Sequence, residues 1–163
     1  MVNIQQESDI YSAVESLQAG KVLVYPTESM YGLGCDPFNE SAVGRLLSLK
    51  KRSKEEGLIL IAANWMQVEQ LIQPITNELR EEINASWPGN KTWIFTKSAL
   101  VPNWISGQHS TVALRVPDHP VALLLCELFK GPIVSTSVNI RGNLHLITIC
   151  LYFVFLKIGD YTN

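Results

Sequence analysis

The stretch KVLVYPTESMYGLG, residues 21–34, indicates the fold class of this 163-residue chain. Apolar residues at helical spacing precede it over residues 10–17 and end before Gly20, which suits the position after a helix. The run VLVY at residues 22–25 contains no charged side chain, as expected of a buried strand. A helix, a buried strand and a glycine-bearing loop in this order are typical of an α/β domain.

The rest of the chain continues this alternation of helices and apolar strands. Asn39, Asn64 and Thr76 are predicted to cap helices, and Pro120 suits the first turn of another. Further strands are predicted at residues 58–62, 92–95, 111–116 and 133–135. The pattern predicts a mixed sheet flanked by helices, with a long loop over residues 26–39.

The composition excludes several other classes of protein. The chain is 47% hydrophobic and 17% charged, which excludes collagen-like, coiled-coil and polyelectrolyte chains. Its net charge of -2 means that contact with a nucleic acid would need a local basic patch. Three cysteines without a C-x-x-C spacing indicate a reduced, cytoplasmic protein, and the first ten residues do not resemble a secretory signal.

The loop PTESMYGLG, residues 26–34, is the first segment that could carry chemistry. Thr27, Glu28 and Ser29 follow the predicted strand at its carboxyl end, where open α/β sheets place ligands. The two glycines form G-x-G, but the third glycine of the dinucleotide fingerprint is absent, and there is no Walker A motif. The segment is therefore either a ligand-binding loop or a glycine-bearing turn.

The cluster KKRSK, residues 50–54, is the second such segment, and it has two interpretations. Cations at the end of a helix complement the helix dipole, so the cluster could be a solvated charge run. A lysine and an arginine one residue apart could instead clamp a triphosphate and neutralise its leaving group.

Two further segments hold polar residues at predicted strands. Arg115 interrupts an apolar strand and is either one half of an edge ion pair or a receptor for a carboxylate. The run STSVN, residues 135–139, either forms a turn or offers uncharged hydrogen-bonding groups to a nucleotide and an amino acid. No Ser-His-Asp or Cys-His arrangement accompanies these segments, which argues against a hydrolase with an activated nucleophile.

Taken together and in this order, these segments resemble the threonylcarbamoyl-AMP synthase family, in its short single-domain form of the YrdC type. The resemblance covers about residues 5–142 and rests on VYPTESMYGLGCDP, LLSLKKRSKEEGLILIAAN, WPGNKTWIF, ALRVPDHP and PIVSTSVN. It implies a twisted α/β sheet flanked by helices, with a concave binding face.

The resemblance also implies an activity. The family makes threonylcarbamoyl-AMP and diphosphate from L-threonine, bicarbonate or CO2, and ATP, an adenylyl transfer to threonine carbamate. A partner complex then transfers the threonylcarbamoyl group to an adenosine of tRNA. Mg2+ is expected to enter with ATP, and no metal site on the protein is expected.

The resemblance assigns roles to individual residues by their position in the motifs. It assigns the ATP site to Lys50, Arg52, Thr111 and Asn139. It assigns the L-threonine site to Thr27, Arg115 and Ser137. Lys50 and Arg52 are the expected catalytic residues, because they would neutralise the departing diphosphate.

A partner class follows from the same resemblance. Some members of the family bind tRNA or double-stranded RNA on the concave, positively charged face. Lys50, Lys51, Arg52 and Lys54 could then form one surface shared with RNA. Alternative functions are a non-catalytic RNA-binding or ribosome-associated module, or an inactive truncated member of the family.

The end of the chain departs from the family pattern. Arg141 stands in place of a serine, and residues 143–163 form an atypical hydrophobic tail where the family continues with a glycine-rich sequence. We therefore expect a C-terminally incomplete domain over residues 1–142, followed by a replaced or frameshifted tail. The apolar run at residues 144–156 is shorter than the roughly 20 residues of a membrane-spanning helix, so no membrane association is expected.

Overall fold

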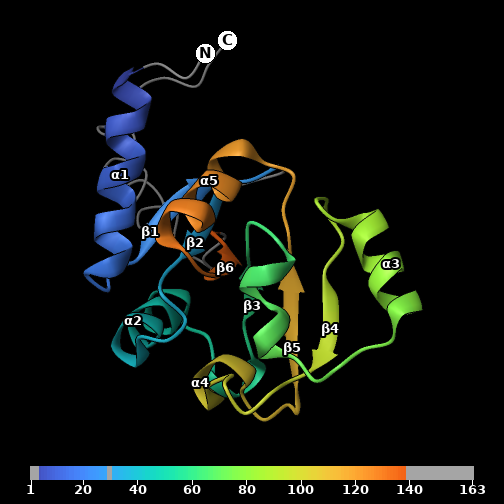
Figure 1. Cartoon of the computed structure of the whole chain (residues 1–163). Helices are drawn as coiled ribbons and strands as arrows, with labels where there is room; N and C mark the ends of the chain where they lie inside the picture. Colours follow the sequence, from blue (N-terminus) through green and yellow to red (C-terminus); the bar gives the residue numbers. More distant parts are fainter. Residues whose placement is uncertain (1–3, 29–30, 139–163) are drawn as a thin grey trace.

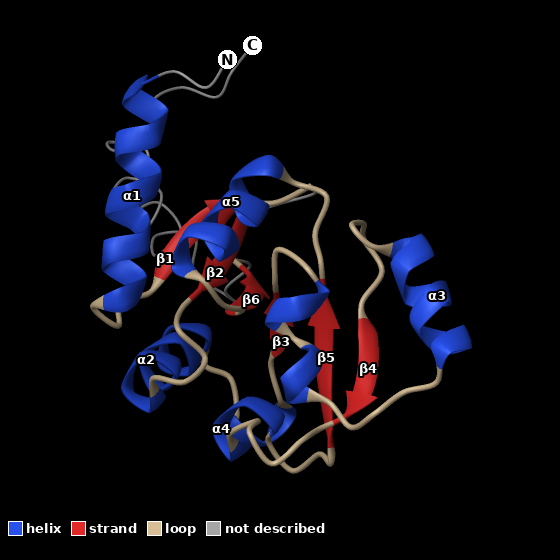
Figure 2. Ribbon diagram, viewed as in Figure 1, coloured by secondary structure: helices blue, strands red, loops and turns tan. Residues whose placement is uncertain are grey.

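A six-stranded mixed sheet organises the residues that the computed structural model describes, 4–28 and 31–138 (Figures 1 and 2). The strands are β1 (Leu23–Pro26), β2 (Tyr31–Gly34), β3 (Ile59–Ile61), β4 (Trp93–Thr96), β5 (Thr111–Arg115) and β6 (Ile133–Ser137). Their order across the sheet is β1-β2-β6-β3-β5-β4, and β3 and β5 run parallel whereas the other neighbours are antiparallel. This confirms the predicted α/β class with a mixed sheet.

Helices pack on both faces of the sheet. They are α1 (Ile4–Gln18), α2 (Glu40–Lys50), α3 (Asn77–Ser86), α4 (Asn103–Ser106) and α5 (Pro120–Phe129), with short 3-10 helices at η1 (Lys54–Glu56), η2 (Trp65–Gln67) and η3 (Glu69–Leu71). The predicted caps at Asn39 and Thr76 are confirmed, since their side chains accept hydrogen bonds from the backbone N–H groups of Ala42 and Leu79. The helix expected after Asn64 is instead a pair of 3-10 turns, and α4 was not predicted.

Alternate strand residues point to two different cores. The first face packs against α2 and α4, through a cluster that includes Val24, Leu33, Val43, Leu46, Leu60, Ile105, Leu114 and Val134. The second face packs against α1 and α5, through Val14, Leu17, Tyr25, Ile61, Ala122, Leu125, Cys126 and Ile133. The second cover is incomplete, because Ile59 and Ile94 on that face are 39% and 70% exposed. The uncovered part of the sheet is where a ligand can reach the strands.

Strand β2 lies inside the segment that the sequence predicts as a loop. It pairs with β1 on one side and β6 on the other, so these two neighbours stabilise a strand too short for its own pattern to reveal. The Tyr25 ring lies directly over Gly32 and Gly34. A Cβ atom on Gly34 would lie 2.8 Å from Tyr25 Cε1 and 2.8 Å from the Val134 carbonyl oxygen. Glycine is thus required in β2 because an aromatic ring occupies the space of a side chain.

Gly34→Ala is expected to destabilise the protein by roughly 1–3 kcal/mol, because the new methyl group forces a ring and a strand backbone apart. Gly44→Ala is the matched control: its Cβ would meet nothing within 4 Å in the middle of α2. There alanine should stabilise the helix by up to about 1 kcal/mol. Urea unfolding followed by circular dichroism measures both changes, and equal stability of the two variants would contradict this account of β2.

Two expectations concern the end of the domain and the possibility of a membrane-spanning helix. The predicted domain end at residue 142 and the hydrophobic tail at 143–163 lie outside the described residues. Within the described part, no helix has both the length and the apolar character needed to cross a bilayer.

Candidate functional site

A cavity of about 300 Å³ lies over the uncovered part of the second sheet face, and we call it the sheet cavity. Residues from β2, β3, β5, β6 and the segments beside them line it. The cavity wall includes Thr27, Arg52, Arg115 and Ser137, to which the resemblance assigned threonine and phosphate binding. Residues more than 100 positions apart in the sequence therefore meet in one place.

The end of α2 brings one cation, Arg52, to the cavity wall and a second, Lys50, to the backbone of the lining residue Ser137. Lys51 has a left-handed backbone (φ 49°) and its N–H bonds back to the helix, so the chain turns sharply between Lys50 and Arg52. Lys50 Nζ donates to the Ser137 carbonyl oxygen at 2.5 Å, and Arg52 Nη2 donates to the Gly57 carbonyl oxygen at 2.9 Å. Partial burial and the charge of Arg52 both lower the pKa of Lys50. Two nearby cations with this mutual repulsion favour an anionic ligand.

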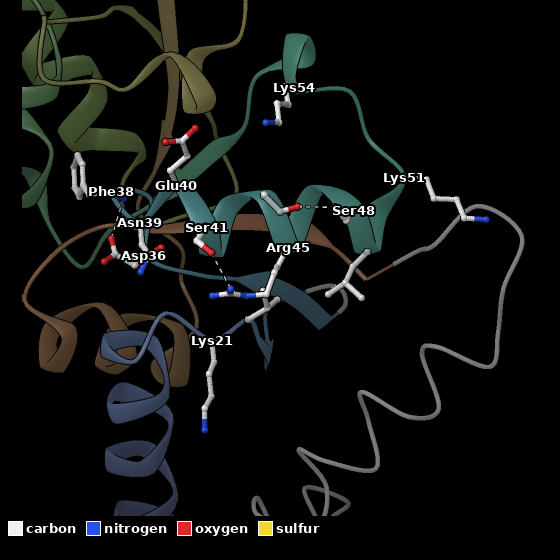
Figure 3. Close-up of a pocket in the computed structure, with 13 residues that line it drawn as sticks. Lys21, Asp36, Phe38, Asn39, Glu40, Ser41, Arg45, Ser48, Lys51 and Lys54 are labelled. Atoms are coloured by element: carbon white, nitrogen blue, oxygen red, sulfur yellow. Dashed lines mark hydrogen bonds between the residues drawn. The ribbon is translucent and has the colours of Figure 1, made fainter.

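The other two lysines of the cluster lie in a different place. Lys51 and Lys54, with Lys21 and Arg45, line an open groove beside α2 of about 1520 Å³, which we call the α2 groove (Figure 3). The acidic residues Asp36 and Glu40 also line this groove near the start of α2, whereas Lys51 lies at the other end of that helix (Figure 3). The single shared surface expected for the lysine-rich cluster is therefore divided between two sites.

Arg115 lies at the end of β5 and makes two fixed contacts. Its Nε donates to the Gly89 carbonyl oxygen at 2.9 Å, and its Nη2 donates to Glu28 Oε1 at 2.5 Å. The sequence left open whether this arginine is in an ion pair or receives a carboxylate. The structure shows an ion pair with Glu28, and it also places the guanidinium on the wall of the sheet cavity. An arginine has five N–H donors, so these two bonds leave others for a ligand.

Glu28 accepts a second hydrogen bond through the same oxygen, from the backbone N–H of Asp118 at 2.7 Å. Burial opposes ionisation of this carboxyl group, but backbone hydrogen bonds and the Arg115 charge outweigh it and lower its pKa. Glu28 is therefore a carboxylate at neutral pH. The sequence placed this residue at a strand end but gave no signal for its partners, which lie about 90 residues further along the chain.

A buried tyrosine bonds one of the serines that line the cavity. Tyr25 donates its hydroxyl proton to Ser135 Oγ at 2.7 Å, and Ser135 lines the sheet cavity. Burial raises the pKa of Tyr25, so its hydroxyl stays protonated and remains a donor. The hydroxyl proton of Ser135 is then directed elsewhere, since its oxygen already accepts the tyrosine bond. Sequence reasoning included Ser135 in a candidate binding segment but gave it no individual role, because the resemblance assigned only Ser137 and Asn139 there.

Lys50 and Thr111, two of the predicted nucleotide residues, are not among the residues that line the cavity, although Lys50 bonds the backbone of the lining residue Ser137. Thr111 begins β5, on the same strand face as Ala113 and Arg115. At about 3.3 Å per residue it lies roughly 13 Å from Arg115 along the strand. A ligand that reached both would extend along the uncovered sheet face. Asn139 lies outside the described residues.

The cysteines described do not form a reactive site. Cys35 and Cys126 are buried, and burial raises the pKa of each thiol to about 12. Thiols of this kind stay protonated and are poor nucleophiles. Among residues 4–28 and 31–138, no group of three or more His, Cys, Asp or Glu side chains could hold a metal ion.

Most of the chain is similar to proteins of one known family. The family model described as "Sua5_yciO_yrdC: Telomere recombination" matches residues 15–151. The chain is 53% identical over 133 residues to a Coxiella burnetii protein named threonylcarbamoyl-AMP synthase, covering 82% of this chain and 72% of that protein. It is 50% identical over 131 residues to a Methylococcus capsulatus protein of the same name, covering 80% and 70%.

A solved structure gives a spatial match. P. abyssi Sua5 complexed with L-threonine superposes with a TM-score of 0.77 at 39% sequence identity. The match covers 82% of this chain and 39% of that chain. The present chain thus spans about two fifths of that Sua5 protein and about 70% of the two bacterial relatives.

Proposed function

This chain belongs to the Sua5, YciO and YrdC family, and we propose that it forms threonylcarbamoyl-AMP and diphosphate from L-threonine, bicarbonate or CO2, and ATP. One observation carries the proposal. Arg115 and Arg52 line one cavity, and Lys50 donates to the carbonyl oxygen of Ser137, a residue that lines the same cavity. This arrangement offers separate receptors for a carboxylate and for a polyphosphate.

Each substrate then has a stated receptor. The threonine carboxylate binds Arg115, while Thr27 and Ser137 supply hydrogen-bonding groups to the rest of the amino acid. The phosphates of ATP bind Lys50 and Arg52, and the nucleotide extends over the uncovered sheet toward Thr111. Mg2+ enters bound to the ATP phosphates, since this ion is usually held by substrate phosphates with few protein ligands.

The chemistry needs positioning more than proton transfer by the protein. The threonine amine forms a C–N bond to CO2 and releases a proton to solvent, which gives a carbamate. A carbamate oxygen then attacks the α-phosphorus of ATP, and the bond from this phosphorus to the departing diphosphate breaks. Lys50 and Arg52 stabilise the charge that develops on the leaving group. This account uses no activated protein nucleophile.

Diphosphate release from ATP, measured with and without L-threonine and bicarbonate, tests the proposal. We expect release that depends on both additions. Release that is the same without threonine would indicate a simple ATP hydrolase, and no release under any condition would contradict the proposed activity.

Contact with tRNA is proposed for the α2 groove. The product is expected to be passed to a partner complex that modifies tRNA in the cytoplasm, so an RNA surface near the site is chemically reasonable. Lys21, Arg45, Lys51 and Lys54 bring four cations to the groove, and they leave Lys50 and Arg52 to the sheet cavity. Cations arranged along a groove attract a phosphate backbone.

Lys51→Glu with Lys54→Glu is expected to weaken tRNA binding by about tenfold at 0.1 M salt and to reduce its salt dependence, because two phosphate contacts are lost. Threonine-dependent diphosphate release should stay within about twofold. Lys130→Glu is the matched control, because Lys130 is exposed and follows α5, outside the α2 groove. Filter binding at several salt concentrations measures the effect. Unchanged tRNA affinity in the double variant would show that the α2 groove is not the RNA surface.

A further inference from the structure

We propose that Glu28 is a positioning residue that fixes Arg115 and the Thr27 segment in the geometry that binds L-threonine, an inference that rests on the function proposed above. Glu28 is the residue that follows Thr27 after β1. Its carboxylate reaches across the sheet cavity to the end of β5, where it meets Arg115 and Asp118. A single side chain thus joins the two segments that would hold the amino acid.

One carboxylate oxygen makes both contacts. Glu28 Oε1 accepts from Arg115 Nη2 at 2.5 Å and from the Asp118 backbone N–H at 2.7 Å. The second contact does not depend on the side chain of residue 118, so it ties the β1 segment to the backbone that follows β5. Movement of either segment would therefore break a charge-assisted hydrogen bond, which is stronger than a neutral one.

The guanidinium of Arg115 is fixed on two of its nitrogens. The Gly89 carbonyl holds Nε at 2.9 Å, and Glu28 holds Nη2. Because the group is planar, two contacts define its plane, and Nη1 has no hydrogen bond to the described residues. The remaining N–H groups thus face a substrate carboxylate in a set orientation. A flexible arginine would have to lose this freedom on binding, at a cost in affinity.

A negative charge beside Arg115 also weakens its attraction for a substrate carboxylate. The Glu28 and Arg115 side chains are 24% and 23% exposed, so solvent screens part of this repulsion. Orientation is a larger effect, since a displacement of about 1 Å at a binding group can cost about 10²-fold in rate. Removal of Glu28 should therefore impair, and not improve, threonine binding.

Glu28→Ala is expected to raise KM for L-threonine by about tenfold or more, while KM for ATP stays within twofold. Glu28→Gln should recover part of the loss, because its amide oxygen can still accept from Arg115 or Asp118. Asp118→Asn is the matched control, since it removes a neighbouring charge but keeps the backbone N–H that Glu28 uses. Calorimetric titration with L-threonine should show the same order of affinities without any turnover.

A second measurement reports on Arg115 directly. The chain has five arginines, so their Nε–H signals in a 15N-labelled sample can be resolved, and Arg115→Lys identifies the relevant one. Glu28→Ala and Glu28→Gln should shift or broaden this signal, and Asp118→Asn should not. If Glu28→Ala cannot be purified folded, Glu28→Gln gives the same comparison.

The outcomes separate the two proposals. Wild-type affinity for threonine in both Glu28 variants, with an unchanged Arg115 signal, would overturn the role of Glu28 and leave the synthase function standing. Equal increases in both KM values together with a lower Tm would show a structural role only, and would also overturn it. A wild-type protein that neither binds threonine nor releases diphosphate would remove the proposed function itself.

Discussion

Arg52→Ala is expected to lower kcat for threonine-dependent diphosphate release by about 10²- to 10³-fold, which corresponds to about 3–4 kcal/mol of transition-state stabilisation. The loss is large because Arg52 would interact most strongly with charge that appears as diphosphate departs. KM for threonine should change little, since its carboxylate is assigned to Arg115 and not to Arg52. Steady-state kinetics with each substrate varied in turn measure the two effects separately.

Two controls belong with Arg52→Ala. Arg52→Lys keeps the charge but loses the planar fork, so partial activity is expected. Lys54→Ala removes a nearby cation that lines the α2 groove, and diphosphate release should be nearly unchanged. Arg52 also bonds Gly57 and pairs with Glu56 at 3.4 Å, so Tm is needed to show that the variant is folded. Full activity in a folded Arg52→Ala protein would contradict the phosphate-binding assignment.

Arg115→Ala is expected to reduce kcat/KM for L-threonine by about 10²-fold or more, because the substrate carboxylate would lose its proposed charged partner and Glu28 would lose its ion-pair partner and keep the Asp118 N–H. Arg115→Lys should restore little, since a single ammonium cannot hold Gly89, Glu28 and a carboxylate in one plane. Kinetics and calorimetric titration with L-threonine measure both losses.

Arg80→Ala is the matched control for Arg115→Ala. The Arg80 guanidinium lies 4.0 Å from the centroid of the Trp65 ring, outside the sheet cavity. Loss of this cation–π contact should lower stability slightly without changing threonine affinity. Should Arg115→Ala bind threonine as tightly as the wild type, the carboxylate assignment would be wrong.

The sequence predicted most of the helices and strands because apolar periodicity and capping residues are local signals. Asn39, Thr76 and Pro120 mark helix starts through bonds or ring geometry within one turn. Strand β2 could not be predicted in this way. Its four residues form a strand because β1 and β6 pair with it, and its glycines fit under a ring that the local pattern does not reveal.

The residues of the site were partly predicted, whereas the contacts between them were not. The family resemblance assigned Thr27, Arg52, Arg115 and Ser137 to one site, and all four line one cavity in the structure, whereas Lys50, which was assigned with them, does not. Their roles as ligands stay predictions. The hydrogen bonds of Glu28 and Tyr25 could not be predicted, because each joins residues about 90 or more positions apart through a fold that has no local signature.

The left-handed backbone of Lys51 has a consequence for how this protein can change over time. It separates adjacent basic residues, since Arg52 lines the sheet cavity and Lys50 contacts its wall at Ser137, whereas Lys51 and Lys54 line the α2 groove. Substitution of Lys51 or Lys54 can therefore alter the attraction of the α2 groove for a polyanion, while Lys50 and Arg52 stay in place. The charge of the α2 groove and the charge at the sheet cavity are set by adjacent residues, yet each can change in evolution without the other.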